Sequence, residues 1–297
     1  MKMIHRAEIV VFALLISPST FAADFTAGSK FPPVSSEAVG PQTRPNGRFG
    51  EQVYNLPVGD RTIRAVVYKP AAFPAPWKIV ILNHGSPGPA RGSYATNMLA
   101  TKFFLDRGYM VVLPTRRGFG VSGGQRADDW GNCNVHKHYQ SGMAGADDVI
   151  SSLNYFLAQD FTQKDGALLV GQSNGGFAVT AAAGNNPKGV AGIINFSGGI
   201  SNGQSHCGAA SVLDAYKRYG VTARLPTIFV YAENDTHFSP DYSKRMFEAY
   251  ASTGANVKYV LLPPIGDGDG HVNMQKDIGV KAWTKPIDGF IASLAPQ

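Results

Sequence analysis

The chain has 297 residues, including 34 glycines and 19 prolines, and 44% of its residues are hydrophobic while 16% are charged. This composition excludes a disordered chain, which would combine low hydrophobicity with high charge, and a collagen, because the glycines follow no triplet period. The formal net charge of +6 comes from scattered basic residues without a basic stripe, so no nucleic-acid partner is expected.

Residues 1–22 have the layout of a secretory signal peptide. Lys2 and Arg6 provide a basic start, an unbroken apolar run covers 9–16, and small residues precede a cleavage site after Ala22 or Ala23. An apolar run of this length is too short to cross a bilayer core of about 30 Å. We therefore expect a periplasmic or secreted protein without a stable membrane anchor.

The region after the signal peptide divides into an arm and one domain. Residues 23–50 are rich in proline, glycine and serine and are interpreted as an extended arm. Residues 51–297 show no break in composition and are interpreted as a single domain. This domain begins with a strand over 52–56 and an alternating strand over 61–69, which we expect to be antiparallel and at a sheet edge.

From residue 78 onward, short apolar runs alternate with segments of helical spacing. Strands covered on both faces are predicted over 79–82, 109–113, 167–170, 190–196, 228–231 and 257–262. Helices are predicted over 94–107, 145–159, 177–183, 242–250 and 281–294. This order predicts the α/β class, a mostly parallel sheet with helices on both faces. The extra chain at 200–223 is interpreted as a possible small cap insertion.

The strongest motif is Gly171-Gln172-Ser173-Asn174-Gly175, which lies between a predicted strand and a predicted helix. A serine at a sharp strand-to-helix turn, with glycine on both sides, is typical of a nucleophile exposed at the carboxyl edge of a sheet. Ser173 is therefore the candidate nucleophile.

A serine hydroxyl needs a base to take its proton, and in this arrangement an acid and then a histidine follow later in the chain. Asp235 follows the fifth predicted buried strand and His271 follows the sixth. His271 would accept the Ser173 proton, and Asp235 would orient the ring and stabilise its charged form. Glu233 is a competing acid, and His237 is an alternative base that is disfavoured by its closeness to Asp235 in sequence.

The oxyanion of a tetrahedral intermediate needs hydrogen-bond donors. One candidate is the backbone N–H of Asn174, directly after the nucleophile. The other is the backbone N–H of Ser86, in the glycine-containing loop 83–88 after the first buried strand. His84 in the same loop is interpreted as a structural residue in preference to a proton-transfer group.

The chain has two cysteines, Cys133 and Cys207. An oxidising compartment would allow them to pair, and a disulfide is the favoured interpretation. Free thiols or a metal site with His136 and His138 are the alternatives, although the spacing of these residues does not match common zinc-ligand pairs. No phosphate-binding or dinucleotide-binding motif opens a predicted helix, so no metal or cofactor is expected.

Together these motifs resemble the α/β-hydrolase superfamily over about residues 52–294. Within it, the chain is similar to dienelactone-hydrolase-like and prolyl-oligopeptidase-like serine hydrolases. The matching pieces are His84-Gly85-Ser86-Pro87, the run Arg117-Gly118-Phe119-Gly120-Val121-Ser122-Gly123-Gly124, the Ser173 turn, Asp235 and His271. The resemblance implies an α/β-hydrolase fold, a Ser173–Asp235–His271 triad and an oxyanion N–H from Ser86. Dienelactone hydrolases themselves carry a cysteine nucleophile where this chain has serine.

The expected function is hydrolysis of small carboxylic esters or lactones through an acyl-enzyme. A serine peptidase acting on short peptides is the second possibility, and a binding protein that kept the fold without catalysis is the third. The limited extra chain at 200–223 favours small, open substrates.

Overall fold

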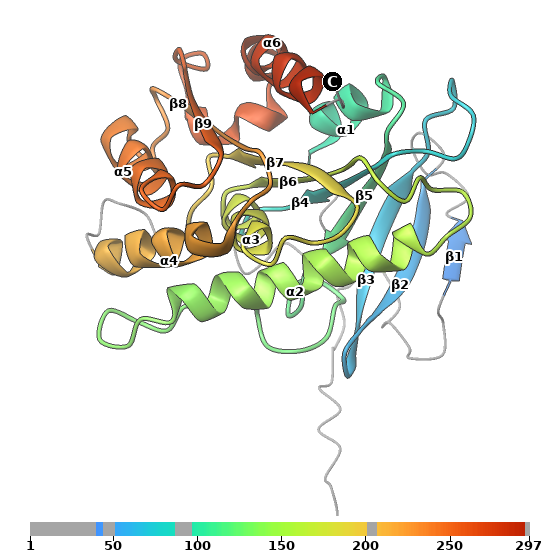
Figure 1. The fold of residues 1–297 in the computed structure, drawn as a ribbon, viewed down its shortest axis with the longest axis horizontal. Coiled ribbons are helices and arrows are strands. Elements are labelled where there is room, and N and C mark those ends of the chain that lie inside the picture. Colours follow the sequence, from blue (N-terminus) through green and yellow to red (C-terminus); the bar gives the residue numbers. More distant parts are fainter. Residues whose placement is uncertain (1–39, 44–50, 87–96, 201–206, 295–297) are drawn as a thin grey trace, which may run out of the picture.

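The computed structural model describes residues 40–43, 51–86, 97–200 and 207–294. The predicted signal peptide and most of the predicted arm lie outside these ranges. The described residues form a nine-stranded sheet with the order β1-β2-β3-β5-β4-β6-β7-β8-β9 (Figure 1). Its strands are β1 Gly40–Thr43, β2 Gln52–Val58, β3 Arg61–Tyr68, β4 Ile79–Asn83, β5 Met110–Thr115, β6 Ala167–Gln172, β7 Val190–Phe196, β8 Thr227–Ala232 and β9 Val257–Leu262.

The sheet is antiparallel on one side and parallel on the other. β1, β2, β3 and β5 pair with one another antiparallel in that order. From β5 through β4, β6, β7 and β8 to β9, all neighbours are parallel. The carboxyl ends of these six strands therefore lie along one edge of the sheet, which we call the carboxyl edge.

Helices cover both faces of the sheet, as predicted (Figure 1). They are α1 Met98–Leu105, α2 His138–Leu157, α3 Asn174–Ala183, α4 Ala209–Thr222, α5 Pro240–Ala251 and α6 Asp277–Ser293. α1 and α6 pack on one face and α2 to α5 on the other, each over its own apolar cluster. In β4, Ile79 and Ile81 face the larger cluster while Val80 and Leu82 face the smaller one. Both faces are thus buried, which is why β4 is a continuous apolar run.

Two strands differ from their predicted positions in the sheet. β3 lies between β2 and β5, which pair with it on either side, and β1, paired with β2, occupies the edge. The prediction of β3 as an edge strand was therefore wrong. β1 consists of Gly-Pro-Gln-Thr, which has no alternation of apolar residues to signal a strand. β9 was predicted to be buried, but it forms the other edge and is largely half-exposed or exposed.

The helix predicted over 145–159 begins earlier, at His138. Its first turns are buried but carry few large apolar residues. Gly142 shows why, because a side chain there would collide with Phe177 and with the hydroxyl of Tyr219. Close packing against α3 and α4 selects small residues in these turns, and the apolar period that marks a helix in sequence is lost.

Most of the stretch interpreted as a cap belongs to the helical layer. Residues 201–206 lie outside the described ranges, and Ala209–Thr222 forms α4. Val212, Ala215, Tyr216 and Tyr219 of this helix are buried against the larger cluster. Their spacing is that of an amphipathic helix packed on a core, and this pattern could have identified the segment from sequence.

Cys133 and Cys207 are joined by a disulfide, with their Cα atoms 5.4 Å apart. The bond connects the loop before α2 to the turn that enters α4. Both sulfurs are used in this bond, so neither is a thiolate for the alternative metal site. In the described ranges, no helix has the length and apolarity that crossing a membrane requires.

Candidate active site

Ser173 lies between the last residue of β6 and the first residue of α3, at the carboxyl edge of the sheet. Its backbone has φ 56° and ψ −124°, a conformation that non-glycine residues rarely adopt. Such strain costs of the order of 1–3 kcal/mol and persists only where the surrounding structure imposes it. The Ser173 N–H donates to the carbonyl of Phe196 at 3.0 Å. The side chain is partly exposed.

The two glycines that flank Ser173 allow the turn to form. A Cβ on Gly171 would collide with the backbone of Gly175. A Cβ on Gly175 would collide with the carbonyl oxygens of Asn83 and His84, at the end of β4 and just after it. Glycine at both positions therefore lets β6, α3 and the loop after β4 approach one another closely.

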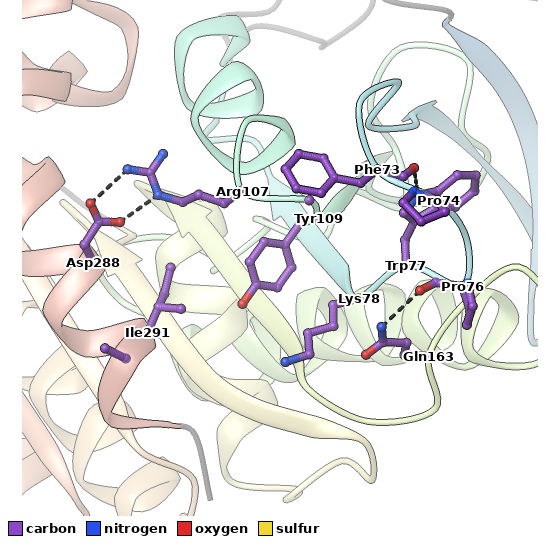
Figure 2. Close-up of a pocket in the computed structure, with 12 residues that line it drawn as sticks. Phe73, Pro74, Pro76, Trp77, Lys78, Arg107, Tyr109, Gln163, Asp288 and Ile291 are labelled. Atoms are coloured by element: carbon purple, nitrogen blue, oxygen red, sulfur yellow. Dashed lines mark hydrogen bonds and ion pairs between the residues drawn. The ribbon is translucent and has the colours of Figure 1, made fainter.

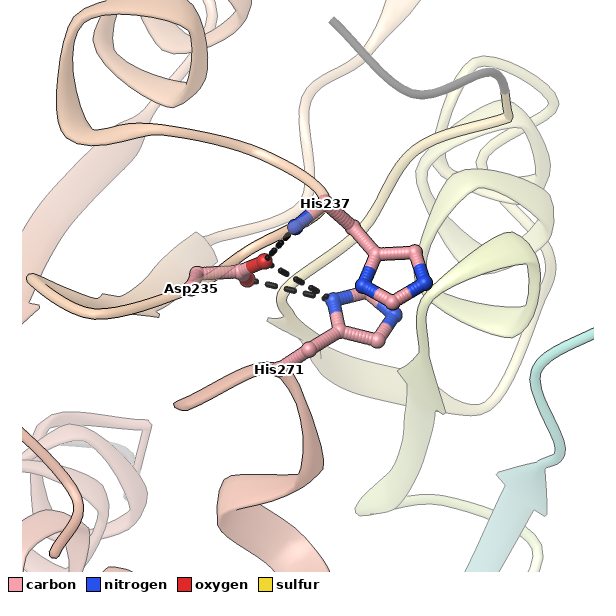
Figure 3. Close-up of side chains that lie close together, drawn as sticks. All are labelled: Asp235, His237 and His271. Carbon is pink, nitrogen blue, oxygen red and sulfur yellow. Dashed lines mark hydrogen bonds and ion pairs between the residues drawn. The ribbon is translucent and has the colours of Figure 1, made fainter. Parts of the chain in front are cut away.

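Asp235 and His271 form a buried pair at the same edge. Asp235 follows β8, and His271 lies in a short 3-10 helix, Gly270–Gln275, after β9. His271 Nδ1 is 3.1 Å from Asp235 Oδ1 and 3.2 Å from Oδ2 (Figure 3). The Asp235 side chain is fully covered and that of His271 is 7% exposed. The pair is thus shielded from water, which strengthens its electrostatic interaction.

Further hydrogen bonds fix both members of the pair. Asp235 Oδ1 also accepts from the backbone N–H groups of His237 and Phe238, each at 2.9 Å. The side-chain amide of Gln172, next to Ser173, donates to the carbonyl of His271 at 3.0 Å. The histidine loop is therefore attached directly to the serine turn.

The alternative acid and base occupy other positions. Glu233 is exposed, while the structure pairs His271 with Asp235. His237 stacks on His271 with 4.1 Å between ring centroids and 22° between planes. Burial and then the neighbouring His271 lower the pKa of His237. Ligand atoms of Asp235, His237 and His271 lie within 4.8 Å of one another. However, nearly parallel imidazole planes do not direct their in-plane lone pairs at one ion, as tetrahedral zinc would require.

The two candidate oxyanion donors lie on either side of the serine turn. Asn174 is buried and is the first residue of α3. Ser86 is exposed, two residues after His84. The loop between them packs on the serine, because a Cβ on Gly85 would lie 3.0 Å from the Ser173 Cβ. The backbone of this loop is therefore packed against Ser173, the candidate nucleophile.

Arg116 is a residue of this site that the sequence interpretation missed. It is fully buried, which is uncommon for a charged side chain. Its guanidinium donates to the carbonyl of His84 at 2.5 Å and to Asn174 Oδ1 at 2.8 Å. Burial lowers the pKa of Arg116 to about 10, although Asp128 and Asp148 oppose the shift. This cation connects the loop after β4 with the start of α3.

His84 is held as a structural residue, in line with its interpretation from sequence. Its Nδ1 lies 2.6 Å from the carbonyl of Gly85, and its Nε2 lies 3.1 Å from the backbone N–H of Arg116. An N–H can only donate, so Nε2 accepts and Nδ1 carries the proton in the neutral ring. Burial and then the Arg116 charge hold the pKa of His84 well below its ordinary value.

A cavity of about 520 Å³ lies away from these residues (Figure 2). Its walls include Lys78 and Tyr109, which directly precede β4 and β5, and Ile291 of α6. An ion pair between Arg107 and Asp288, 2.7 Å apart, closes one side. The cavity is therefore at the amino-terminal edge of the strands, opposite Ser173, and contains none of the candidate site residues.

Comparisons with known proteins agree with this fold. A family model described as the alpha/beta hydrolase fold matches residues 78–206. No curated protein matches the sequence. Among solved structures, the esterase Pf2001 of Pyrococcus furiosus is similar with a TM-score of 0.62 and 15% identity, over 89% of this chain and 99% of that one.

Two further solved structures are similar over most of this chain. Est1E of Butyrivibrio proteoclasticus, solved with bound ferulic acid, has a TM-score of 0.58 and 14% identity, over 81% of this chain and 98% of its own. An acylaminoacyl peptidase of Pyrococcus horikoshii has a TM-score of 0.57 and 15% identity, over 82% of this chain and 41% of its own. Likeness at these identities concerns the fold. With its sheet order, its strand-to-helix serine turn and the family model that matches residues 78–206, the chain has the α/β-hydrolase fold.

Proposed function

We propose that this protein is an exported serine hydrolase that cleaves small carboxylic esters or lactones. The observation that carries the proposal is the strained backbone of Ser173, at the same sheet edge as the buried His271–Asp235 pair. Strain of this kind is concentrated at functional sites, and this turn exposes a serine hydroxyl.

In the proposed reaction, His271 Nε2 accepts the proton of the Ser173 hydroxyl as the oxygen attacks the carbonyl carbon of the ester. Asp235 holds Nδ1 and stabilises the imidazolium that forms. The carbonyl oxygen becomes an oxyanion, which accepts hydrogen bonds from the N–H groups of Asn174 and Ser86. The C–O bond then breaks as His271 returns the proton to the leaving alcohol oxygen.

Deacylation repeats these steps with water. His271 takes a proton from a water molecule as the water oxygen attacks the acyl-enzyme, and the proton then returns to the oxygen of Ser173. The acid product leaves, and the site is restored. The nucleophile, the base, the acid that orients it and the oxyanion donors in this scheme are all groups of the chain itself.

Ester hydrolysis is the first choice of chemistry, and peptide hydrolysis is the alternative. One of the similar structures is named as an esterase and one as an acylaminoacyl peptidase, and Est1E was solved with bound ferulic acid. The packed position of α4 supports a small substrate, because the described part of 200–223 adds a helix to the core layer and no separate cap domain. Export is supported by the pattern of residues 1–22 and by the disulfide.

Covalent labelling by a fluorophosphonate, followed by a panel of p-nitrophenyl esters and aminoacyl amides, tests the proposal. We expect the wild-type protein to be labelled and to prefer the esters. Ser173→Ala should abolish labelling and lower kcat roughly 10⁴-fold or more. Ser252→Ala, at an exposed serine that ends α5, is the matched control and should behave like the wild type. An unlabelled, inactive wild-type protein would favour a binding role, and a preference for amides would favour the peptidase.

A further inference from the structure

The loops that follow β8 and β9 have the same local structure. Each contains an aspartate, one intervening residue and a histidine, which are Asp235 and His237 in one loop and Asp269 and His271 in the other. Asp235 Oδ1 accepts from the backbone N–H of His237 at 2.9 Å. Asp269 Oδ1 accepts from the backbone N–H of His271 at 2.8 Å. Each aspartate thus shapes the turn that presents the histidine of its own loop.

Each histidine ring contacts the aspartate of the other loop. His271 Nδ1 lies 3.1 Å from Asp235, in the other loop. His237 Nδ1 lies 3.5 Å from Asp269 Oδ2, again in the other loop. The backbone N–H of Thr236 adds a third link, because it donates to Asp269 Oδ1 at 3.0 Å. His271 is therefore hydrogen-bonded to the carboxylate that orders the opposite turn, whereas His237 Nδ1 lies within ion-pair distance of Asp269 and also 3.3 Å from Thr236 Oγ1.

The two rings lie face to face. Their centroids are 4.1 Å apart and their planes differ by 22°. Figure 3 shows both outer ring nitrogens pointing to the same side, away from Asp235. The contact covers one face of His271, and Phe238 lies against the same ring with 5.4 Å between centroids. His271 is thus confined by ring contacts as well as by its hydrogen bond.

The two pairs differ in their exposure to solvent. The Asp235 and His271 side chains are almost fully covered, whereas those of His237 and Asp269 are 50% and 31% exposed. Burial and the neighbouring His271 lower the pKa of His237. A neutral ring on one face of His271 can stabilise a charge on it without adding like-charge repulsion.

We infer that His237, anchored by Asp269, is a positioning residue that holds the His271 ring in its reactive orientation by stacking on it. This inference rests on the proposed function, since His271 must act as the base for its orientation to matter. A general base has to be within hydrogen-bond reach of the proton that it takes. A ring that is free to tilt would spend less time in that position, which lowers kcat more than it changes substrate binding.

Three variants test this inference. His237→Ala removes the stacked ring and should lower kcat about tenfold with KM little changed, the scale that one stacked ring pair supports. His237→Phe keeps an aromatic ring on His271 but cannot pair with Asp269, so its kcat should lie between those of the wild type and of His237→Ala. Asp269→Asn keeps an acceptor for the backbone N–H of His271 but loses the charge that anchors His237, and it should also lower kcat.

A double-mutant cycle decides whether His237 and Asp269 act together. If Asp269 acts through His237, then adding Asp269→Asn to His237→Ala should cause little further loss of kcat. Fully additive losses would overturn the inference, as would a His237→Ala variant with wild-type kcat. A large rise in KM for His237→Phe would show that the side chain contacts substrate and would also overturn it. Fluorophosphonate labelling of Ser173 in the wild type separates these outcomes from a failure of the proposed function, and thermal unfolding checks that each variant is folded.

Discussion

Acid should destabilise the protein through His138, the first residue of α2. The ring is fully buried and stacks on Trp130 with 4.8 Å between centroids. Within the described part of the chain, neither of its ring nitrogens has a hydrogen-bond partner. Burial, followed by the neighbouring His136, lowers the pKa of His138 to about 4 from its ordinary value of 6.5. The folded protein therefore holds this histidine neutral at a pH where an unfolded chain would protonate it.

The sign of the effect follows from proton uptake. Below pH 6.5 the unfolded chain binds a proton at His138, and the folded protein does not until the pH approaches 4. The contribution to stability is complete above pH 6.5 and is lost as the pH falls towards 4. A shift of this size corresponds to about 3 kcal/mol. Because His136 beside the ring is exposed, solvent next to this pair offsets part of the penalty, and we expect a loss of about 1–2 kcal/mol.

Urea unfolding at pH 7.5 and pH 5 measures this loss. The free energy of unfolding of the wild type should fall between these two values, and that of His138→Gln should fall less by about 1 kcal/mol. His84, the other buried histidine with a lowered pKa, is present in both proteins, so the difference isolates His138. His136→Gln, at an exposed position, is the control and should follow the wild type. An unchanged pH dependence in His138→Gln would refute this reasoning.

Three other predictions concern the site and its disulfide. Arg116→Met should lower kcat/KM at least about tenfold, because the loop after β4 loses its link to α3. The free energy of unfolding should change by less than about 2 kcal/mol, since removal of a buried charge offsets the loss of two hydrogen bonds. Steady-state kinetics and urea unfolding would contradict this if stability collapsed while activity survived. Asp235→Asn should lower kcat about 10⁴-fold and Glu233→Gln should leave it unchanged, and the reverse order in kinetic assays would assign the acid to Glu233. Denatured, unreduced protein from the periplasm should contain no free thiol at Cys133 or Cys207, and reduction of their bond should lower the unfolding free energy by up to about 4 kcal/mol. Two free thiols would rule the bond out in the exported protein.

The sequence predicted those parts of the fold whose signals are local. The bounds of β7 match the predicted strand, and the serine turn lies where the Gly-x-Ser-x-Gly pattern sets it. A strand covered on both faces must be apolar throughout, and a sharp turn between β6 and α3 needs glycine, so a few adjacent residues are enough to identify each. Their alternation with helical segments then indicated the α/β class.

Features that depend on distant partners could not be predicted in this way. Arg116 is buried because the carbonyl of His84 and the side chain of Asn174 accept hydrogen bonds from its guanidinium. Nothing beside Arg116 in the sequence reveals these partners. The exchange between the loops of His237 and Asp269 is likewise set by the pairing of β8 with β9. Long-range contacts of this kind arise from the tertiary fold, which single-sequence patterns do not encode.

The exchanged contacts between the loops after β8 and β9 also limit how this edge of the molecule can diverge. Asp269 orders the turn of His271 and anchors the ring of His237, so neither loop is an independent module. A substitution at 237 removes the ring that Asp269 contacts, and a substitution at 269 removes the carboxylate beside the ring of His237. Among homologous proteins, positions 237 and 269 should therefore covary, and a graft of one loop into another scaffold should succeed only when both are transferred.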